Sequence, residues 1–257
     1  MTNNAAETAV EILNPGGQGN FVLVCDHASN AFPAEYGSLG LDAAECARHI
    51  AYDIGAAEVT RILSRELDAP AVLARWSRLL IDVNRDTASP TLIPEVSDGT
   101  EIPGNRDMTD AERERRIRDF YIPFHEAVDQ TVRAAMAGDR VPIVMAVHSF
   151  TPVMNGRKRP WHVGLLWNRD PRLAARMIEA YEARGFTVGD NEPYSGRHLF
   201  YTMDRHGARH GLPQATLEIR QDEVTDAAGI ARWAEITAAV LREIAAEPEL
   251  RIRRVYG

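Results

Sequence analysis

Residues 79–86 read Leu-Leu-Ile-Asp-Val-Asn-Arg-Asp, an apolar run that gives way abruptly to two carboxylates, an amide and a guanidinium. The apolar part predicts a buried strand at Leu79–Asp82. Such a strand would carry its polar side chains to its C-terminal end, where open α/β sheets place their binding and catalytic sites. We therefore interpret the rest of the chain from this stretch outward.

Three other apolar runs end in polar side chains of a similar kind. These runs place His27 after residues 21–25, His148 after residues 143–147, and Glu218 within residues 215–219. If the runs are parallel strands, their polar ends meet at one edge of the sheet. Two histidines, a glutamate and an Asn-Arg pair at four strand ends are the side chains that a metal hydrolase requires.

Helical patterns alternate with these strands. Apolar residues recur at helical spacing over residues 42–62, 109–136, 170–183 and 225–246. Asp42 is the expected N-cap of the first helix, and Asp53 with Gly55 is expected to split that helix in two. The alternation predicts a single α/β domain over residues 1–257, with three layers and a mixed, mostly parallel sheet between helices.

Three segments are predicted to be irregular. Residues 1–19 are small and polar, and we expect a loose lead-in there. Residues 87–104 are rich in proline and are expected to form a long surface loop, of a length that is often functional. Residues 191–211 are rich in Tyr, Arg, His and Gly, and we expect them to cover a substrate.

Composition excludes several classes of protein. The chain has 257 residues, 45% of them hydrophobic and 26% charged, which fits a globular domain rather than a disordered chain or a fibre. A net charge of -8 argues against a nucleic-acid or anionic-membrane surface, so the expected partner is a small molecule. Two cysteines cannot form a disulfide framework, and no stretch resembles a signal peptide or a membrane span. A cytoplasmic location is therefore expected.

His27 and His148 are the first candidate metal ligands. Imidazole suits zinc, and a catalytic zinc site needs three protein ligands and an open position for water. The alternative is that each is an ordinary loop histidine held by a backbone carbonyl. Both interpretations stay open at this point.

The polar end of residues 79–86 offers further roles. Asp82 is either a buried salt-bridge partner or a carboxylate that accepts the free ring N–H of a ligating histidine. Asn84 and Arg85 offer several N–H donors, and an arginine can grip a carboxylate with two parallel hydrogen bonds. The Asn-Arg pair therefore suits an acidic or α-carboxylate substrate.

Glu218 stands inside an apolar run, where a charged residue is unexpected. A glutamate beside metal-bound water can act as general base and then pass the proton to the leaving amine. The alternative is an ion pair with Arg220 or another arginine at a sheet edge. Strand alternation also places Arg78 on the same face as Asp82, from which it could reach the pocket and stabilise an oxyanion.

Taken in chain order, these motifs resemble one family. They are Asp26-His27-Ala28-Ser29-Asn30-Ala31-Phe32-Pro33, Ser77-Arg78-Leu79-Leu80-Ile81-Asp82-Val83-Asn84-Arg85, His148-Ser149-Phe150 and Thr216-Leu217-Glu218-Ile219-Arg220. From Phe21 to Asp222 the chain resembles the zinc carboxypeptidase and aminoacylase-2 superfamily, and within it the N-formylglutamate amidohydrolase family. The resemblance implies a phosphorylase/hydrolase-like fold and one zinc ion. It also implies these roles: His27 and His148 as zinc ligands, Asp82 orienting His27, Asn84 and Arg85 holding the substrate carboxylate, and Glu218 as base.

One position departs from the superfamily pattern. Where carboxypeptidase-like members have a metal-binding glutamate three residues after the first histidine, this chain has Asn30. A neutral amide oxygen is a poorer zinc ligand than a carboxylate, so the metal set is either completed by Asn30 or joined by another acid. Asp53, isolated among apolar helical positions, is the candidate for that acid, and a helix cap at the break is the alternative interpretation.

The expected function is that of a zinc-dependent amidohydrolase. It would remove an N-formyl or other N-acyl group from an acidic amino acid such as N-formylglutamate. Arg197 and Tyr201, in the late irregular segment, are added as candidate substrate contacts. Two alternatives remain: hydrolysis of another N-acyl amino acid, imino compound or short peptide, and a non-catalytic carboxylate-binding protein.

Overall fold

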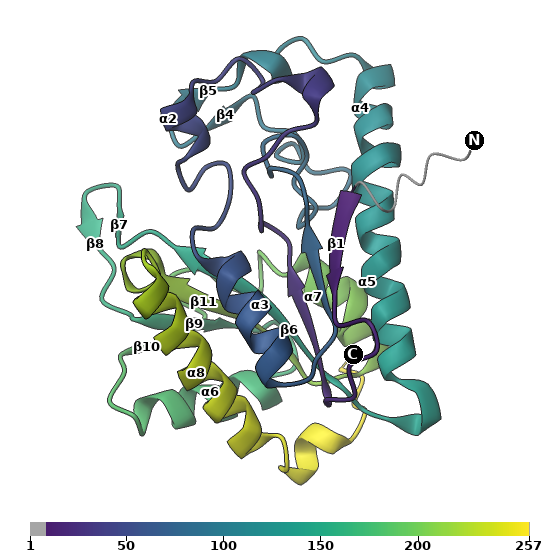
Figure 1. Cartoon of the computed structure of the whole chain (residues 1–257), viewed down its shortest axis with the longest axis vertical. Helices are drawn as coiled ribbons and strands as arrows, with labels where there is room; N and C mark the ends of the chain where they lie inside the picture. The colour runs from purple at the N-terminus through teal and green to yellow at the C-terminus, as the bar shows by residue number, and fades with distance from the viewer. Residues whose placement is uncertain (1–8, 257) are drawn as a thin grey trace.

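The middle strand of the sheet, β6, is apolar along most of its length and buried throughout because helices cover both of its faces. The computed structural model describes residues 9–256, and its main sheet has seven strands in the order β1-β3-β2-β6-β11-β9-β10 (Figure 1). The strands are β1 (Val10–Leu13), β2 (Phe21–Cys25), β3 (Ala71–Ala74), β6 (Ile143–Phe150), β9 (Val163–Leu166), β10 (Val188–Asp190) and β11 (Gln214–Arg220).

Four neighbouring strands, β3, β2, β6 and β11, run parallel to one another. At the edges, β1 is antiparallel to β3, and β9 is antiparallel to β11, while β10 is parallel to β9. The prediction of a mixed, mostly parallel sheet is confirmed. Because the four central strands are parallel, their C-terminal ends all open at one edge of the sheet.

The helices lie in two layers, one on each face of the sheet (Figure 1). One layer contains α3 (Ala56–Glu66), α6 (Arg172–Glu182) and α8 (Ala227–Ile244), and the other contains α5 (Ile122–Ala135) and α7 (Tyr201–His206). Successive side chains of β2 point to opposite faces of the sheet and so contribute to both cores. Leu23 packs with the first layer, whereas Val22 and Val24 pack with the second. The predicted three-layer α/β/α domain is confirmed.

Shorter elements connect these layers. The remaining α-helices are α2 (Ala43–Cys46) and α4 (Asp110–Arg116), and the short strands form two hairpins, β4 (Val96–Ser97) with β5 (Thr100–Glu101) and β7 (Val153–Met154) with β8 (Arg157–Lys158). The single turns are η1 (Ala34–Tyr36), η2 (Pro103–Asn105), η3 (Ile117–Tyr121), η4 (Ala137–Asp139), η5 (Ala208–His210), η6 (Gln221–Glu223) and η7 (Pro248–Arg251). Within residues 9–256, no helix has both the length and the apolarity needed to cross a bilayer.

The predicted strand at Leu79–Asp82 is wrong, because Leu79 and Leu80 lie in a turn and Ile81 and Asp82 in irregular backbone. They are buried as expected, but their polar backbone groups find partners outside any strand ladder. The carbonyl of Leu79 accepts from the Asn105 side chain at 2.8 Å, and the carbonyl of Leu80 accepts from Arg116 at 3.0 Å. Two buried polar side chains thus donate the hydrogen bonds to these backbone carbonyls that a neighbouring strand would otherwise donate.

The segment predicted as a surface loop, residues 87–104, covers these turns. It contains the β4–β5 hairpin, and Leu92 and Ile102 are fully buried in the core. The backbone N–H of Asp82 donates to the Leu92 carbonyl at 2.7 Å. Most of the segment is exposed or half-buried, as predicted for a surface loop, and Leu92 and Ile102 anchor it over residues 79–86.

Three further elements differ from their predicted form. The lead-in contains β1, which pairs with β3, and its residues 1–8 lie outside the described part of the chain. The helix predicted over residues 109–136 is divided by η3, a π-helical turn, just before Pro123, which has no N–H for a helical hydrogen bond. The late irregular segment contains α7.

Candidate active site

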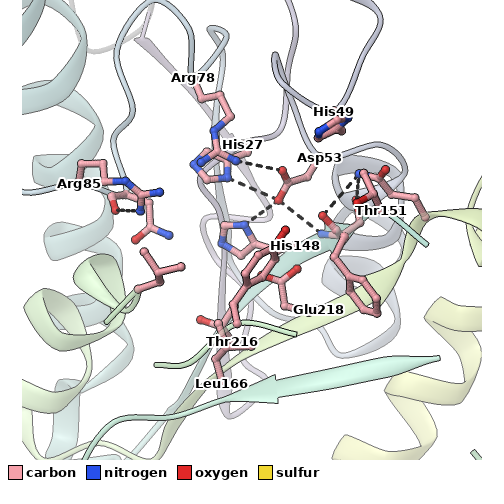
Figure 2. A pocket seen from close by; sticks show the side chains of 16 residues that line it. His27, His49, Asp53, Arg78, Arg85, His148, Thr151, Leu166, Thr216 and Glu218 are labelled. Atoms are coloured by element: carbon pink, nitrogen blue, oxygen red, sulfur yellow. Dashed lines mark hydrogen bonds and ion pairs between the residues drawn. The ribbon is translucent and has the colours of Figure 1, made fainter. Parts of the chain in front are cut away.

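Adjacent parallel strands bring three of the predicted site residues to one edge of the sheet. His27 is the second residue after β2, His148 lies on β6, and Glu218 lies on β11 at the position paired with His148. All three side chains are buried. Figure 2 shows them converging on one pocket, as the strand-end pattern predicted.

Asp53 joins the two histidines from the break between α2 and α3. The break needs Gly55, whose φ of +79° is left-handed and whose added Cβ would lie 2.6 Å from the Val224 carbonyl oxygen. Asp53 Oδ2 lies 2.7 Å from His148 Nδ1 and 3.5 Å from His27 Nδ1. The three residues offer ligand atoms that all lie within 4.8 Å of one another.

Each histidine has a second carboxylate at its other ring nitrogen. His27 Nε2 lies 2.9 Å from Asp82 Oδ1, and His148 Nε2 lies 3.3 Å from Asp26 Oδ2. Both Nδ1 atoms face Asp53, so a tautomer with the proton on Nε2 would donate to the outer carboxylate and leave Nδ1 to a metal ion. Carboxylates in this outer position fix the tautomer and orientation of a metal-binding imidazole.

The charges of the cluster shift its pKa values strongly. Burial alone would lower the pKa of His148, but hydrogen bonds to Asp26 and Asp53 raise it well above the usual value for histidine. Burial would likewise raise the pKa of Asp82, but Arg78 and His27 hold it well below its usual range. The Asp82 carboxylate therefore remains ionised, stabilised by the positive charge of Arg78 beside it.

The donor set fits a divalent metal ion. Three buried polar atoms of the site, Asp26 Oδ1, His27 Nδ1 and Glu218 Oε2, have no hydrogen-bond partner in the described chain. Two imidazole nitrogens and one carboxylate are the donors of a catalytic site that keeps an open position. A cation between His27, Asp53 and His148 would satisfy the unpaired ring nitrogen of His27 and balance the carboxylates.

Asn30 is not part of this cluster, so the structure contradicts its predicted place beside the histidines. Its side chain is exposed, and its amide donates to the Cys46 carbonyl at 3.0 Å. Asn30 is not among the residues that line the pocket around the histidines. Of the two predicted candidates for a third ligand, the fold brings Asp53 to the histidines and leaves Asn30 outside.

Glu218 has the surroundings of a general base. Burial raises its pKa to about 7, with His148 opposing and Asp53 adding to the shift. Arg220, the predicted alternative partner, pairs instead with Asp222 at 2.6 Å. Among the described residues no ion pair engages Glu218, and it lines the pocket directly.

The pocket is a cavity of about 180 Å³ that extends from the histidines to Asn84 and Arg85. Its other lining residues are His49, Asp53, Arg78, Ser149, Phe150, Thr151, Leu166, Tyr194, Leu199, Thr216, Glu218 and Gln221. The side-chain oxygen Oδ1 of Asn84 accepts from the backbone N–H and hydroxyl of Thr202, both at 3.1 Å. These bonds leave the amide N–H groups of Asn84 as the free end of its side chain, beside the Arg85 guanidinium.

Arg78 is more engaged than predicted. Its guanidinium lies 2.8 Å from Asp82 and 3.5 Å from Asp53, so it links these two carboxylates. The face shared by Arg78 and Asp82 comes from a turn and not from strand alternation. Arg78 lines the cavity, but its positive charge is already paired with two carboxylates.

Arg197 and Tyr201 lie outside this cavity. Both line a neighbouring hollow of about 360 Å³, which shares Asn84 and Arg85 with the main cavity. The Tyr201 hydroxyl is held by Arg205 at 2.6 Å and lies 2.7 Å from the Tyr121 hydroxyl. The structure therefore does not bring these two predicted contacts to the histidine site.

Two residues of the site were missed from the sequence. Asp26 precedes His27 at the end of an apolar run, and that position is a signal that could have marked it. Tyr194 lies in residues 191–211, which the sequence predicted to cover a substrate, but no local pattern singled out this residue. Its presence in the cavity wall is a finding of the structure alone.

Buried histidines and carboxylates at parallel strand ends, around a partnerless glutamate, are typical of hydrolases. A family model for N-formylglutamate amidohydrolases matches residues 19–225, and the chain belongs to this family. Its membership places the protein among the amidohydrolases. No match was found among curated proteins.

Two solved structures are similar over nearly their full length. A gene product of Agrobacterium tumefaciens has 37% sequence identity and a TM-score of 0.91, covering 94% of this chain and 96% of its own. An N-formylglutamate amidohydrolase from Ralstonia eutropha JMP134 has 20% identity and a TM-score of 0.71, covering 92% of this chain and 97% of its own. At 20% identity the second likeness concerns the fold.

Proposed function

We propose that this protein is a zinc-dependent amidohydrolase that removes an N-formyl or other N-acyl group from an acidic amino acid. The observation that carries the proposal is the cluster of His27, Asp53 and His148, with the partnerless Glu218 paired in register on the next strand. Two imidazoles, a carboxylate and a free glutamate form the set needed to bind a metal and activate water.

His27, Asp53 and His148 would hold the zinc ion. When bound, zinc lowers the pKa of its water toward about 7 and polarises an acyl carbonyl. Asp82 and Asp26 keep the two imidazoles in the tautomer that leaves Nδ1 free for the metal. Arg78 holds the charges of Asp53 and Asp82 together, so the carboxylates keep their places when the site is empty.

Glu218 supplies the proton transfers. It takes a proton from the attacking water, whose oxygen bonds to the acyl carbon, and gives that proton to the nitrogen as the C–N bond breaks. The products are a carboxylic acid, formate for a formyl substrate, and the free amine. A carboxyl group with a pKa near neutrality can take up and release a proton at physiological pH.

Arg85 and Asn84 would bind the substrate carboxylate. The free amide N–H groups of Asn84 and the guanidinium of Arg85 lie together on the wall of the cavity. Charge-assisted hydrogen bonds from such a pair favour a carboxylate over a neutral group of similar size. This wall supports an acidic substrate such as N-formylglutamate, and it fits other N-acyl amino acids as well.

The test combines metal content with a substrate panel. Elemental analysis of the purified protein should find close to one zinc per chain, and the His27→Ala, His148→Ala double variant should contain none. The panel compares N-formylglutamate, N-acetylglutamate, N-formylglutamine and N-formylleucine, with release of the free amine as readout. Zinc-loaded protein that cleaves none of them, but binds glutamate, would support a non-catalytic carboxylate-binding protein instead.

A further inference from the structure

One tyrosine in the cavity wall has no part in the mechanism described above. The Tyr194 hydroxyl oxygen accepts a hydrogen bond from the Arg159 guanidinium at 3.1 Å. A guanidinium can only donate, so the tyrosine must be the acceptor and its own proton is free. Across residues 9–256 no acceptor for that proton is found, and Tyr194 lines the cavity beside Glu218.

Arg159 is fixed to the strand that carries His148. It donates to the carbonyl and hydroxyl oxygens of Thr151, at 3.3 and 3.2 Å, and its own N–H donates to the Pro152 carbonyl. Its guanidinium carbon also lies 4.8 Å from the centroid of the Tyr194 ring. Thr151 lines the cavity just beyond the end of β6, so Arg159 ties the tyrosine to that end of the strand.

The backbone of the tyrosine segment is seated on the sheet. Gly164 on β9 and Gly189 on β10 are register partners, and a Cβ on either would lie 2.1 or 2.2 Å from the Glu192 carbonyl oxygen. The Asn191 side chain also accepts from the backbone N–H groups of Trp167 and Gly196. These contacts place Tyr194 by tertiary structure rather than leaving it on a free loop.

The surroundings of the phenol keep it protonated. Burial raises the pKa of Tyr194, the charges of Glu218 and Asp53 raise it further, and Arg159 opposes them. A neutral phenol is a hydrogen-bond donor, and Tyr194 lines the cavity with a hydroxyl proton for which the described residues offer no acceptor.

We propose that Tyr194 is a catalytic residue that donates its hydroxyl hydrogen bond to the substrate acyl oxygen as negative charge develops there, with Arg159 as its positioning residue. This role rests on the proposed amide hydrolysis. The tyrosine keeps its proton throughout, because the proton that reaches the leaving nitrogen comes from water through Glu218. Arg78, the oxyanion candidate from the sequence, is already paired with two carboxylates.

The test is a comparison of Tyr194→Phe, Arg159→Met and the double variant with wild type on N-formylglutamate. Loss of one oxyanion donor lowers kcat by about 10²- to 10³-fold, and KM should stay within about threefold because the bond strengthens in the transition state. The double variant should lose no more than Tyr194→Phe, since Arg159 acts through the Tyr194 hydroxyl, which Tyr194→Phe already removes. Tyr36→Phe, remote from the cavity, is the matched control.

The outcomes separate this role from the proposed function. Inactive zinc-loaded wild type on the whole panel overturns the amidohydrolase and the tyrosine role together. Active wild type with a fully active Tyr194→Phe overturns only the tyrosine role. A raised KM with unchanged kcat would also overturn it, by showing a contact made equally in the ground state. Zinc content and the melting temperature are measured for every variant, and loss of either in Tyr194→Phe would assign the residue a structural role instead.

Discussion

Asp53 Oδ2 lies 2.7 Å from His148 Nδ1, although 95 residues separate them in the chain. Asp53 comes from a break between two helices, and His148 comes from the central strand of the sheet. The contact joins a connecting segment to the sheet edge and completes a set of three possible metal ligands. The tests below examine this set and the residues that support it.

Asp53 and Asn30 can be separated as ligands by metal content. Asp53→Ala removes one of three donors and should weaken zinc binding by more than about 100-fold, beyond the 10–100-fold typical of an outer-shell change. Asn30→Ala removes only an exposed bond to the Cys46 carbonyl and should keep its zinc. Competition with a chelator of known affinity measures both. Zinc lost from Asn30→Ala and kept by Asp53→Ala would reverse this assignment.

Asp26 is expected to act through His148. Asp26→Asn keeps the shape but removes the charge beside His148 Nε2, and zinc affinity should fall by about 10–100-fold. The exposed Asp222→Asn, at the end of the neighbouring strand, serves as control and should bind zinc like wild type. Equal affinity in both variants would show that the Asp26 carboxylate does not tune the site.

Gly55 should couple backbone strain to the metal site. Gly55→Ala places a Cβ 2.6 Å from the Val224 carbonyl oxygen at a left-handed position, so the break that carries Asp53 must shift. We expect a loss of more than about 1 kcal/mol in the free energy of unfolding, together with weaker zinc binding. Gly138→Ala is the control, because Gly138 is also left-handed, with a φ of +68°, but its added Cβ meets nothing within 4 Å. Normal zinc affinity in Gly55→Ala would show that the break does not position Asp53.

Arg85 should determine the preference for carboxylate substrates. Arg85→Ala should raise KM for N-formylglutamate by about 10- to 100-fold, since a hydrogen bond to a charged group contributes about 1.5–3 kcal/mol. Arg197→Ala removes a guanidinium from the neighbouring hollow and should change KM little. Both variants are also assayed on N-formylglutamine, which keeps only the α-carboxylate, and on the amide of N-formylleucine, which is uncharged. An equal loss on carboxylate and uncharged substrates would refute the role of Arg85.

A buried histidine pair should make stability depend on pH. His206 Nε2 lies 2.9 Å from His125 Nδ1 between α7 and α5. Burial and Arg205 lower the pKa of His206 from 6.5 to about 4. Burial, with Arg205 and His206, also lowers the pKa of His125. Because the folded values lie below the unfolded one, this stability is complete above pH 6.5 and is lost as the pH falls toward 4.

The loss can be measured by urea unfolding. Titration of His206 alone should cost about 2 kcal/mol of unfolding free energy between pH 7 and pH 5. His206→Gln, compared under the same metal loading, should lose about 2 kcal/mol less unfolding free energy over the same pH range. The comparison between the two proteins cancels the contribution of carboxylates that titrate in both. Parallel curves for the two proteins would contradict the shifted pKa of His206.

Much of the site was predictable because strand ends carry a local signal. An apolar run precedes or surrounds each of His27, His148 and Glu218, and short apolar runs of this kind predict buried strands. The same logic failed at Leu79–Asp82, where burial was right and the strand was wrong. A short apolar run does not show whether a neighbouring strand or a buried side chain will satisfy its backbone, and here Asn105 and Arg116 satisfy it.

The amino-acid sequence by itself determined the class of fold, the histidines and glutamate of the site, and the family, because these depend on local periodicity and short motifs. Only the tertiary structure decided between Asp53 and Asn30, paired Asp26 with His148, and brought Tyr194 to the cavity wall. Those contacts join residues from separate segments. Their distances depend on how the helices, turns and covering segments pack around the sheet, which no local pattern records.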